Sequence, residues 1–128
     1  MNIEKKAIEI VMEYEREQNR NSKDVSEGKC GFDIQSGNRH IEVKGQSSEK
    51  ARFLWINNSI VRKLGKGLAH YWVYVVYNIN DKPKLKILEP DTIFKNLQID
   101  TQFKLTAKVI NSCRDEEVNS RPRKKKKR

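Results

Sequence analysis

Residues 31–45 of the chain read Gly-Phe-Asp-Ile-Gln-Ser-Gly-Asn-Arg-His-Ile-Glu-Val-Lys-Gly. Apolar and polar residues alternate on both sides of Ser36-Gly37-Asn38, which is a turn signal, so the stretch predicts a β-hairpin. Because successive side chains of a strand point to opposite faces, Glu42 and Lys44 share one face of this hairpin. Asp33 lies on the first strand, and opposed residues of a hairpin bring their Cβ atoms to about 5 Å. The hairpin thus gathers two carboxylates and an ammonium.

These three groups indicate a particular chemistry. A hard divalent cation binds to clustered carboxylate oxygens, and hydrolysis of a phosphodiester requires such a cation and a means of activating water. Asp33 and Glu42 repel each other at this distance unless a cation or a proton lies between them. Lys44 offsets part of the repulsion, and it could orient or help to deprotonate the attacking water. The layout therefore suggests the core of a metal-dependent nuclease.

The Glu42–Lys44 pair has a simpler interpretation as well. Glu-x-Lys pairs are common on exposed strands, where the ion pair contributes only about 0–1 kcal/mol and indicates no function. The apolar residues of both strands point to the opposite face, and they are Phe32, Ile34, Ile41 and Val43. A hairpin that packs on a core requires this pattern. Gly45 follows Lys44 directly and would let a ligand or another backbone approach closely. Both features favour a site.

A further carboxylate comes from a predicted amphipathic helix over residues 3–19, whose apolar positions recur at helical spacing. At about 100° per residue, Glu15 falls inside the apolar arc and Glu13 on the polar side. A carboxylate among apolar side chains requires a partner or a metal ion, because burying it unpaired is costly. Two interpretations stay open: Glu15 belongs to the site of the hairpin, or it is a helix-edge glutamate paired with a lysine or arginine.

The remaining pattern predicts an α/β or α+β domain in which helices cover a mixed sheet. Tyr71–Tyr77 is a continuous apolar run typical of a central strand covered on both faces, and a strand over 84–88, ended by Pro90, could pair beside it. Further predicted elements are a polar loop over 19–29, a strand over 53–56, a helix over 57–68, a short helix or irregular piece over 94–99, and a segment at 103–110 that fits either a strand or a helix.

The composition fits one soluble domain with a core, since the 128 residues are 36% hydrophobic and 34% charged. Cys30 and Cys113 have neither metal-ligand nor disulfide spacing, which is compatible with a reducing cytosol. The N-terminus has no apolar signal core, and Tyr71–Tyr77, the longest apolar run, is too short to cross a bilayer. We therefore expect a cytoplasmic protein, or a nuclear one if the source is eukaryotic, with no membrane contact.

The C-terminus is strongly basic. Its charged residues are Arg121, Arg123, Lys124, Lys125, Lys126, Lys127 and Arg128. Removing these seven charges from the net charge of +10 leaves +3 for residues 1–120. We expect one domain over residues 1–115 and a disordered basic tail over 116–128. Such a tail binds phosphates without reading sequence, so a polyanion such as DNA is the expected partner. The alternative is a solvated tail with no dedicated partner.

Several motifs follow one another along the chain. They are Tyr14-Glu15-Arg16, Asp24-Val25-Ser26, Gly31-Phe32-Asp33-Ile34-Gln35-Ser36, Ile41-Glu42-Val43-Lys44-Gly45, Tyr71-Trp72-Val73-Tyr74-Val75-Val76 and Glu89-Pro90. In these motifs, residues 7–90 resemble the domain found at the C-terminal end of the plant protein NO VEIN and in many prokaryotic proteins. That domain is assigned to the PD-(D/E)xK nuclease superfamily. One departure is Asn57-Asn58, where the family often has Asn-Glu.

The resemblance implies a restriction-endonuclease-like fold, with a central mixed sheet flanked by helices. It implies that Asp33 and Glu42 are metal ligands, that Lys44 is the catalytic lysine, and that Glu15 is a helix-borne acid completing the metal shell. The expected activity is that of a Mg²⁺- or Mn²⁺-dependent DNA endonuclease in defence, restriction or repair. Such nuclease modules often accompany helicase or defence-system proteins, and a homodimer would also fit this class.

An alternative from another class is a nucleic-acid-binding module that has kept the fold without the chemistry, as a subunit of a larger complex. An RNA-binding or protein-interaction domain has only the basic tail in its favour.

Two single residues also keep two interpretations each. Asp24 is either an acid near the hairpin or an Asx turn that holds Val25 and Ser26. His40 either lines the cleft beside Glu42 or is a solvated residue at the edge of its strand.

Overall fold

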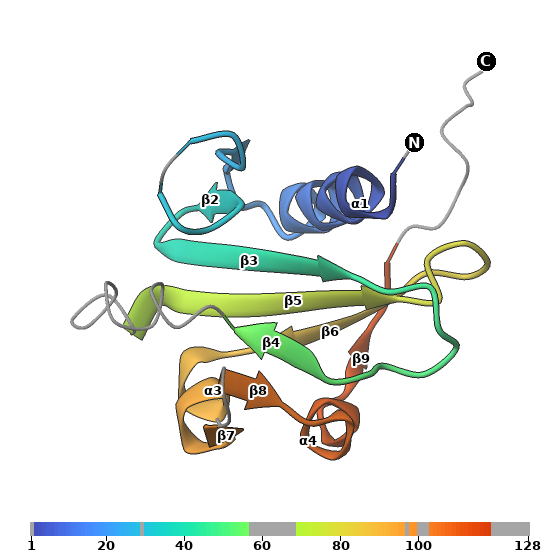
Figure 1. The fold of residues 1–128 in the computed structure, drawn as a ribbon. Coiled ribbons are helices and arrows are strands. Elements are labelled where there is room, and N and C mark those ends of the chain that lie inside the picture. Colours follow the sequence, from blue (N-terminus) through green and yellow to red (C-terminus); the bar gives the residue numbers. More distant parts are fainter. Residues whose placement is uncertain (1, 29, 57–68, 97, 100–102, 119–128) are drawn as a thin grey trace.

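The computed structural model describes residues 2–28, 30–56, 69–96, 98–99 and 103–118 (Figure 1). Its large sheet contains, in spatial order, β1 (Ser22–Asp24), β2 (Ile34–Ser36), β3 (Arg39–Gly45), β5 (Tyr71–Tyr77), β6 (Lys84–Leu88) and β9 (Asp115–Glu116). Within this described sheet, β3 and β5 run parallel and every other neighbouring pair runs antiparallel. The predicted mixed sheet is therefore confirmed.

Helices cover both faces of this sheet. Helix α1 (Ile3–Glu17) lies on one face, and α3 (Pro90–Asn96) and α4 (Ala107–Ser112) lie on the other (Figure 1). A small antiparallel sheet lies on the side of α3 and α4, in the order β4 (Leu54–Ile56), β8 (Phe103–Leu105) and β7 (Gln98–Ile99). The α/β class is thus confirmed. In the described part of the chain, no helix has the length and apolar character needed to cross a bilayer.

The hairpin forms where the sequence predicts it. Ile34 pairs with Ile41 and Ser36 with Arg39, which leaves a two-residue loop between β2 and β3. Gly37 in this loop has a φ of 58°, a left-handed conformation that glycine adopts without steric cost. Along its other edge β3 pairs with β5 in parallel. The hairpin therefore joins the middle of the large sheet.

Helix α1 packs closely on β3. Ala7 of α1 and Ile41 and Val43 of β3 are buried together in one hydrophobic core. A Cβ at Gly45 would lie 2.7 Å from Cγ2 of Ile3 and 3.1 Å from the Ile3 carbonyl oxygen. Any side chain at position 45 would therefore push the helix away. The close approach expected at this glycine is that of the backbone of α1.

Strand β5 is buried on both faces, as its apolar run predicts. Tyr74 belongs to the core under α1. Val73 and Val75 belong to a second core, which they share with Ile93 of α3 and Ile110 of α4. This arrangement explains why β5 lacks the polar–apolar alternation of a strand that faces water on one side.

One segment differs from the local expectations, and two others are defined more closely by the structure. β1 forms inside the stretch predicted to be a loop over 19–29. The segment 103–110 contains the strand β8 followed by the helix α4. Thr106 separates them, because it follows the last residue of β8 and is the N-cap of α4. Its side-chain oxygen accepts a hydrogen bond from the Val109 N–H at 3.3 Å. Pro90 follows β6 by two residues and is the first residue of α3, a position where its missing N–H costs nothing.

The predicted strand over 53–56 is observed as β4, although in the small sheet. The piece predicted over 94–99 comprises the end of α3 and the strand β7. The predicted helix over 57–68 and residues 119–128 of the tail predicted over 116–128 lie outside the described residues, whereas Glu116, expected in that tail, belongs to β9.

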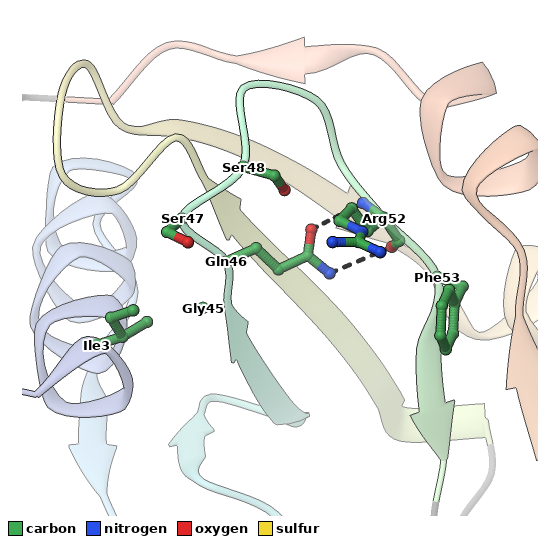
Figure 2. A pocket seen from close by; sticks show the side chains of 7 residues that line it. All are labelled: Ile3, Gly45, Gln46, Ser47, Ser48, Arg52 and Phe53. Atoms are coloured by element: carbon green, nitrogen blue, oxygen red, sulfur yellow. Dashed lines mark hydrogen bonds between the residues drawn. The ribbon is translucent and has the colours of Figure 1, made fainter.

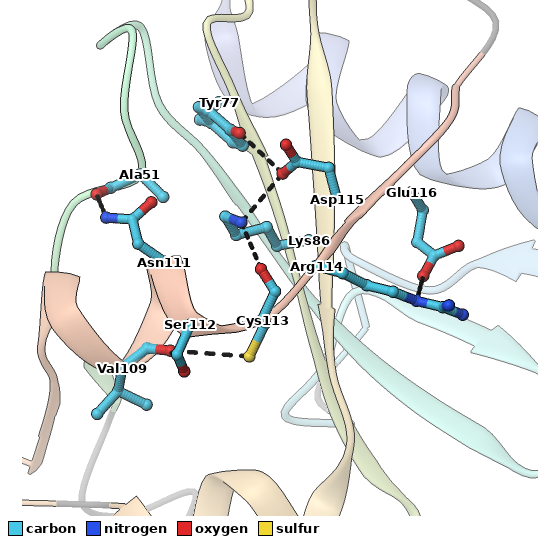
Figure 3. A network of polar contacts seen from close by, with 10 residues as sticks. All are labelled: Ala51, Tyr77, Lys86, Val109, Asn111, Ser112, Cys113, Arg114, Asp115 and Glu116. Carbon is cyan, nitrogen blue, oxygen red and sulfur yellow. Dashed lines mark hydrogen bonds and ion pairs between the residues drawn. The ribbon is translucent and has the colours of Figure 1, made fainter.

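Strand β9 is held in the large sheet by a polar network around Lys86 (Figure 3). Lys86 is only 5% exposed, and its Nζ donates to the carbonyl oxygen of Cys113 at 2.5 Å. The same Nζ lies 3.1 Å from Oδ1 of Asp115, which also accepts a hydrogen bond from the Tyr77 hydroxyl at 2.8 Å. A buried ammonium needs such acceptors. These contacts fix a two-residue strand whose polar sequence gives no periodic signal.

Candidate active site

Glu42 and Lys44 lie on the face of β3 that points away from α1. The register with β5 sets Glu42 beside Val73 and Lys44 beside Val75, and both valines belong to the core on the side of α3 and α4. Nζ of Lys44 is 3.2 Å from Oε2 of Glu42, and 36% and 15% of the two side chains are exposed. The pair is thus partly exposed, neither in the core nor in open solvent. Both side chains lie on the same face of β3, as strand alternation predicts.

Asp33 is fixed at the edge of β3 beside Glu42. Its N–H donates to the Ile41 carbonyl at 2.9 Å, which continues the ladder one residue beyond β2. One carboxylate oxygen, Oδ2, accepts a hydrogen bond from the Val43 N–H at 2.8 Å. The Ile41 carbonyl and the Val43 N–H lie on either side of Glu42 along β3, so the two bonds hold Asp33 beside Glu42. The side chain therefore takes the place of the missing strand partner and stays next to the second acid.

The electrostatics of the two acids reflect their proximity. Burial first, and the negative charge of Asp33 next, raise the pKa of Glu42 to about 7, while Lys44 opposes the shift. Burial also raises the pKa of Asp33, against the lowering effect of its hydrogen bond from Val43. The site therefore contains two carboxylates whose joint ionisation is unfavourable. A cation placed between them would relieve this repulsion.

Two further residues belong to the surroundings of these acids, and sequence reasoning did not identify either. Tyr71, 1% exposed, has a pKa raised by burial and then by the charges of Glu42 and Asp33. Glu4, in the first turn of α1, contributes negative charge that raises the pKa of both acids. The packing of Ile3 on Gly45 brings that turn to the end of β3. A helix pattern alone gives no indication of this placement.

Glu15 lies elsewhere. It is completely buried under α1, where it accepts hydrogen bonds from Nε and Nη2 of Arg20 at 2.5 and 2.9 Å. The hydroxyls of Ser36 and Tyr74 donate to the same carboxylate at 2.9 and 2.7 Å. Burial alone would raise the pKa of Glu15, but the hydrogen bonds from Arg20, Tyr74 and Ser36 outweigh it and lower the pKa. The carboxylate is fully satisfied by the protein.

The expectation that Glu15 joins the metal shell is therefore corrected. Its partner Tyr74 belongs to the core on the α1 face, whereas Glu42 and Lys44 point to the opposite face of the same sheet. The helix phase itself was predicted correctly, since Glu15 is buried and Glu13 is 28% exposed in an ion pair with Arg16. Helical periodicity gives the side of the helix that is buried, but not the side of the sheet on which the helix lies.

The remaining hairpin residues have local roles. Asp24 accepts hydrogen bonds from the N–H and the hydroxyl of Ser26 at 2.9 and 2.6 Å, which is the Asx-turn alternative. Phe32 does not join Ile34 in the core. It stacks on His40 with ring centroids 4.4 Å apart, because it precedes β2 and follows Gly31 at a φ of 88°, where strand alternation no longer applies. His40 is thus covered by an aromatic ring on the face of Glu42.

Asp33 and Glu42 are the acids that a divalent cation could share. Across residues 2–118, gaps excepted, no group of three or more His, Cys, Asp and Glu side chains is arranged to hold a metal ion. Two carboxylates nevertheless fit Mg²⁺, which keeps several waters and binds through one or two carboxylates together with substrate phosphates. The expected phosphate-binding residues 121–128 lie outside the described part of the chain.

A mixed sheet with helices on both faces and an Asp–Glu–Lys cluster on its central hairpin defines a class, the α/β proteins of the restriction-endonuclease-like or PD-(D/E)xK fold. Within this class, the chain belongs to the NO VEIN C-terminal family, whose model matches residues 3–88.

A solved structure supports the assignment of the fold. The 1.6 Å structure of Hjc, a Holliday junction resolvase from the archaeal hyperthermophile Archaeoglobus fulgidus, superposes with a TM-score of 0.55. The similarity covers 84% of this chain and 89% of Hjc, at 17% sequence identity. At that identity the likeness concerns the fold alone. A search of the curated proteins found no significant sequence match.

Proposed function

We propose that the chain is a metal-dependent DNA endonuclease of the PD-(D/E)xK type, acting in defence, restriction or repair. The observation that carries the proposal is the shared placement of Asp33, Glu42 and Lys44 on one face of the central hairpin. The likeness to the fold of Hjc, a Holliday junction resolvase, agrees with it. DNA is accordingly the proposed partner, and Mg²⁺ or Mn²⁺ the proposed cofactor.

Asp33 and Glu42 would hold the cation. When bound, a divalent cation polarises a phosphoryl oxygen and lowers the pKa of a coordinated water. Asp33 contributes a carboxylate fixed in place by the Val43 N–H. Glu42, with a pKa of about 7, loses its proton readily only near neutral pH or above. Deprotonation of Glu42 is therefore a condition for filling the site.

Lys44 would act on the water and on the phosphate. Its ammonium, 3.2 Å from Glu42, is within reach of a phosphate that approaches the two acids. In that position it can orient the attacking water and stabilise negative charge as it develops on the phosphate oxygens. The basic residues 121–128 would supply attraction to the DNA backbone without sequence readout. In this proposal the nuclease domain, predicted to end at residue 115, also includes Glu116, which pairs with Leu85 in β9, and the basic tail follows it.

One observation favours the second candidate, a binding module without chemistry. Among the described residues, no group of three or more His, Cys, Asp and Glu side chains is arranged to hold a cation, so the site offers the pair of Asp33 and Glu42. Such a pair can belong to a domain that has kept the fold and lost the activity.

Incubation of the full chain with supercoiled plasmid DNA distinguishes the two candidates. The nuclease proposal expects nicked or linear DNA in the presence of Mn²⁺ or Mg²⁺ and intact DNA with a chelator. It also expects that Lys44→Ala binds the plasmid and leaves it intact. DNA that is bound but never cut by the wild-type chain with either metal, with Asp33→Ala behaving identically, supports the binding module instead.

A further inference from the structure

A pocket of about 420 Å³ opens directly after the Glu42–Lys44 strand (Figure 2). It lies between Ile3 of α1 and the segment that leads into β4. Its wall includes the chain from Gly45 to Ser48 together with Arg52 and Phe53. The pocket therefore adjoins the site described above, but contains none of its charged residues.

Gln46 links this pocket to the strand that carries the site. Its N–H donates to the Val76 carbonyl at 2.8 Å, so the parallel pairing with β5 continues one residue beyond β3. By alternation, Gln46 then shares the face of Glu42 and Lys44. Two residues of extended chain span about 7 Å, so Gln46 is the next residue after Lys44 on this face of the strand. A polymer in contact with Lys44 can continue into the pocket.

The same glutamine fixes Arg52. Its side-chain oxygen accepts a hydrogen bond from the Arg52 N–H at 2.8 Å, and its amide nitrogen donates to the Arg52 carbonyl at 3.1 Å (Figure 2). This reciprocal pair closes the loop 46–52 and sets the position from which the Arg52 side chain extends. Among the residues that the structure describes, no acceptor is paired with its guanidinium. A positioned, exposed guanidinium is suited to a phosphate.

Phe53 adds an aromatic surface next to this cation. In the described part of the chain it is the large hydrophobic side chain that remains exposed, at 41%. Its ring lines the pocket beside Arg52 (Figure 2). A guanidinium for the backbone and an aromatic face for stacking is the combination by which proteins hold single-stranded nucleic acid.

We infer that this pocket binds an unpaired nucleotide of the DNA strand next to the cleaved phosphate. Arg52 would contact the phosphate of that nucleotide, and the base would stack on Phe53. The face of a paired base is covered by its neighbours in the duplex, so stacking on Phe53 requires a base that is out of the helix. The inference rests on the proposed function and makes it more specific: the substrate class is DNA with an unpaired nucleotide at the cleavage point.

The test uses the full chain and two 5′-labelled DNA duplexes of the same sequence, one fully paired and one with a single unpaired 2-aminopurine. Binding is measured from 2-aminopurine fluorescence with Ca²⁺ present, and cleavage with Mn²⁺. The variants are Phe53→Leu, Phe53→Tyr, Arg52→Gln and, as a control, Lys50→Gln. Lys50 is an exposed cation of the same loop that lines a different hollow, with Tyr77 and Asn111.

The inference expects that wild-type protein binds and cuts the duplex with the unpaired base preferentially, with quenched 2-aminopurine fluorescence. Phe53→Leu should lose about tenfold in affinity for that duplex and most of the quenching, and Phe53→Tyr should restore both. Arg52→Gln should weaken binding where Lys50→Gln does not.

The two proposals fail in different ways. If the wild-type chain cuts both duplexes equally, and Phe53→Leu and Arg52→Gln match it in binding, quenching and cleavage, the nucleotide pocket is wrong and the nuclease proposal stands. If no DNA is cut while Phe53→Leu abolishes the quenching, the pocket stands and the nuclease proposal is wrong.

Discussion

Glu15 and Glu42 are two carboxylates on opposite faces of one central sheet, and their surroundings shift their pKa values in opposite directions. Glu15 is wholly buried, yet the hydrogen bonds it accepts from Arg20, Ser36 and Tyr74 lower its pKa. Glu42 retains some exposure, yet burial and the neighbouring Asp33 raise its pKa to about 7. Burial alone therefore does not determine the direction in which the pKa of a carboxyl group shifts.

The difference lies in what surrounds each carboxylate. Donors occupy both oxygens of Glu15, so nothing remains for a ligand to supply, and its contacts tie α1 to the hairpin and to β5. Glu42 has one cation partner, Lys44, and an acid beside it. Perturbed pKa values of this kind cluster at functional sites. The comparison gives Glu15 a role in the stability of the α1 face and leaves the other face for the proposed chemistry.

The largest expected effect concerns the face that carries the proposed active site. Asp33→Ala should lower DNA cleavage by at least about 100-fold, because it removes one of the two proposed cation ligands, and Lys44→Ala should do the same by removing the charge that acts on the phosphate. Cleavage rates under single-turnover conditions, with circular dichroism as the check on folding, measure this. Rates within about threefold of wild type for both folded variants would remove the assignment of chemistry to this face.

The α1 face should show its effect in stability. Glu15→Gln removes the charge that Arg20 and the two hydroxyls satisfy, so we expect the free energy of unfolding to fall by about 3 kcal/mol in urea titrations. Glu13→Gln, which affects a partly exposed carboxylate paired with Arg16, should change it by less than about 0.5 kcal/mol. Per folded molecule, both variants should cut DNA as wild type does. A specific loss of cleavage in folded Glu15→Gln protein would place Glu15 in the machinery after all.

A pH titration of stability separates the two faces by sign. Glu42 has a folded pKa of about 7 against an ordinary value of 4.5, so between these pH values the folded state binds more protons than the unfolded state. Its contribution therefore decreases stability as pH rises through this window. In metal-free buffer, the titration of Glu42 should lower the free energy of unfolding of the wild type by about 2 kcal/mol between pH 5 and 7.5, and Glu42→Gln should not show this decrease.

Glu15 should act with the opposite sign. Its folded pKa is lowered, so its contribution is present above the ordinary value and disappears as pH falls below it. Urea midpoints measured from pH 3 to pH 8 for wild type, Glu15→Gln and Glu42→Gln give both slopes. If Glu15→Gln and Glu42→Gln both change the pH dependence of stability in the same direction, the contrast between the two environments is mistaken.

The smallest effect on both faces is expected from the tail. Deletion of residues 121–128 removes seven positive charges, so affinity for long DNA should drop at low salt and the salt dependence should flatten. Stability and the cleavage rate of saturated complexes should not change. Filter binding between 50 and 200 mM salt, compared with urea titration, provides the measurement. A destabilised deletion variant would show that the tail packs on the domain.

The sequence predicted those parts of the fold that depend on local periodicity. Alternation correctly placed Glu42 and Lys44 on one face, and helical phase correctly buried Glu15 rather than Glu13. Local periodicity could not show that α1 lies on the face of the sheet opposite Glu42 and Lys44. The face on which a helix packs depends on contacts between distant elements, such as that of Ile3 with Gly45.

The same limit applies to the residues that sequence reasoning missed. Glu4 comes near the acids only because the first turn of α1 reaches the end of β3. β9 forms because Lys86 and Tyr77 both engage Asp115, partners that lie more than 25 residues apart in the chain. Neither arrangement produces a pattern within a short window. Long-range packing therefore decides what the local pattern leaves open.

Mn²⁺ binding tests most directly whether the reactive carboxylates are those of the hairpin face. Electron paramagnetic resonance of Mn²⁺ titrated into the wild-type chain at pH 8, where Glu42 is ionised, should show a bound fraction. Glu42→Gln and Asp33→Ala should lose it, and Glu15→Gln should keep it in its folded fraction. Retention of Mn²⁺ by Glu42→Gln and Asp33→Ala, together with its loss from folded Glu15→Gln, would contradict the assignment.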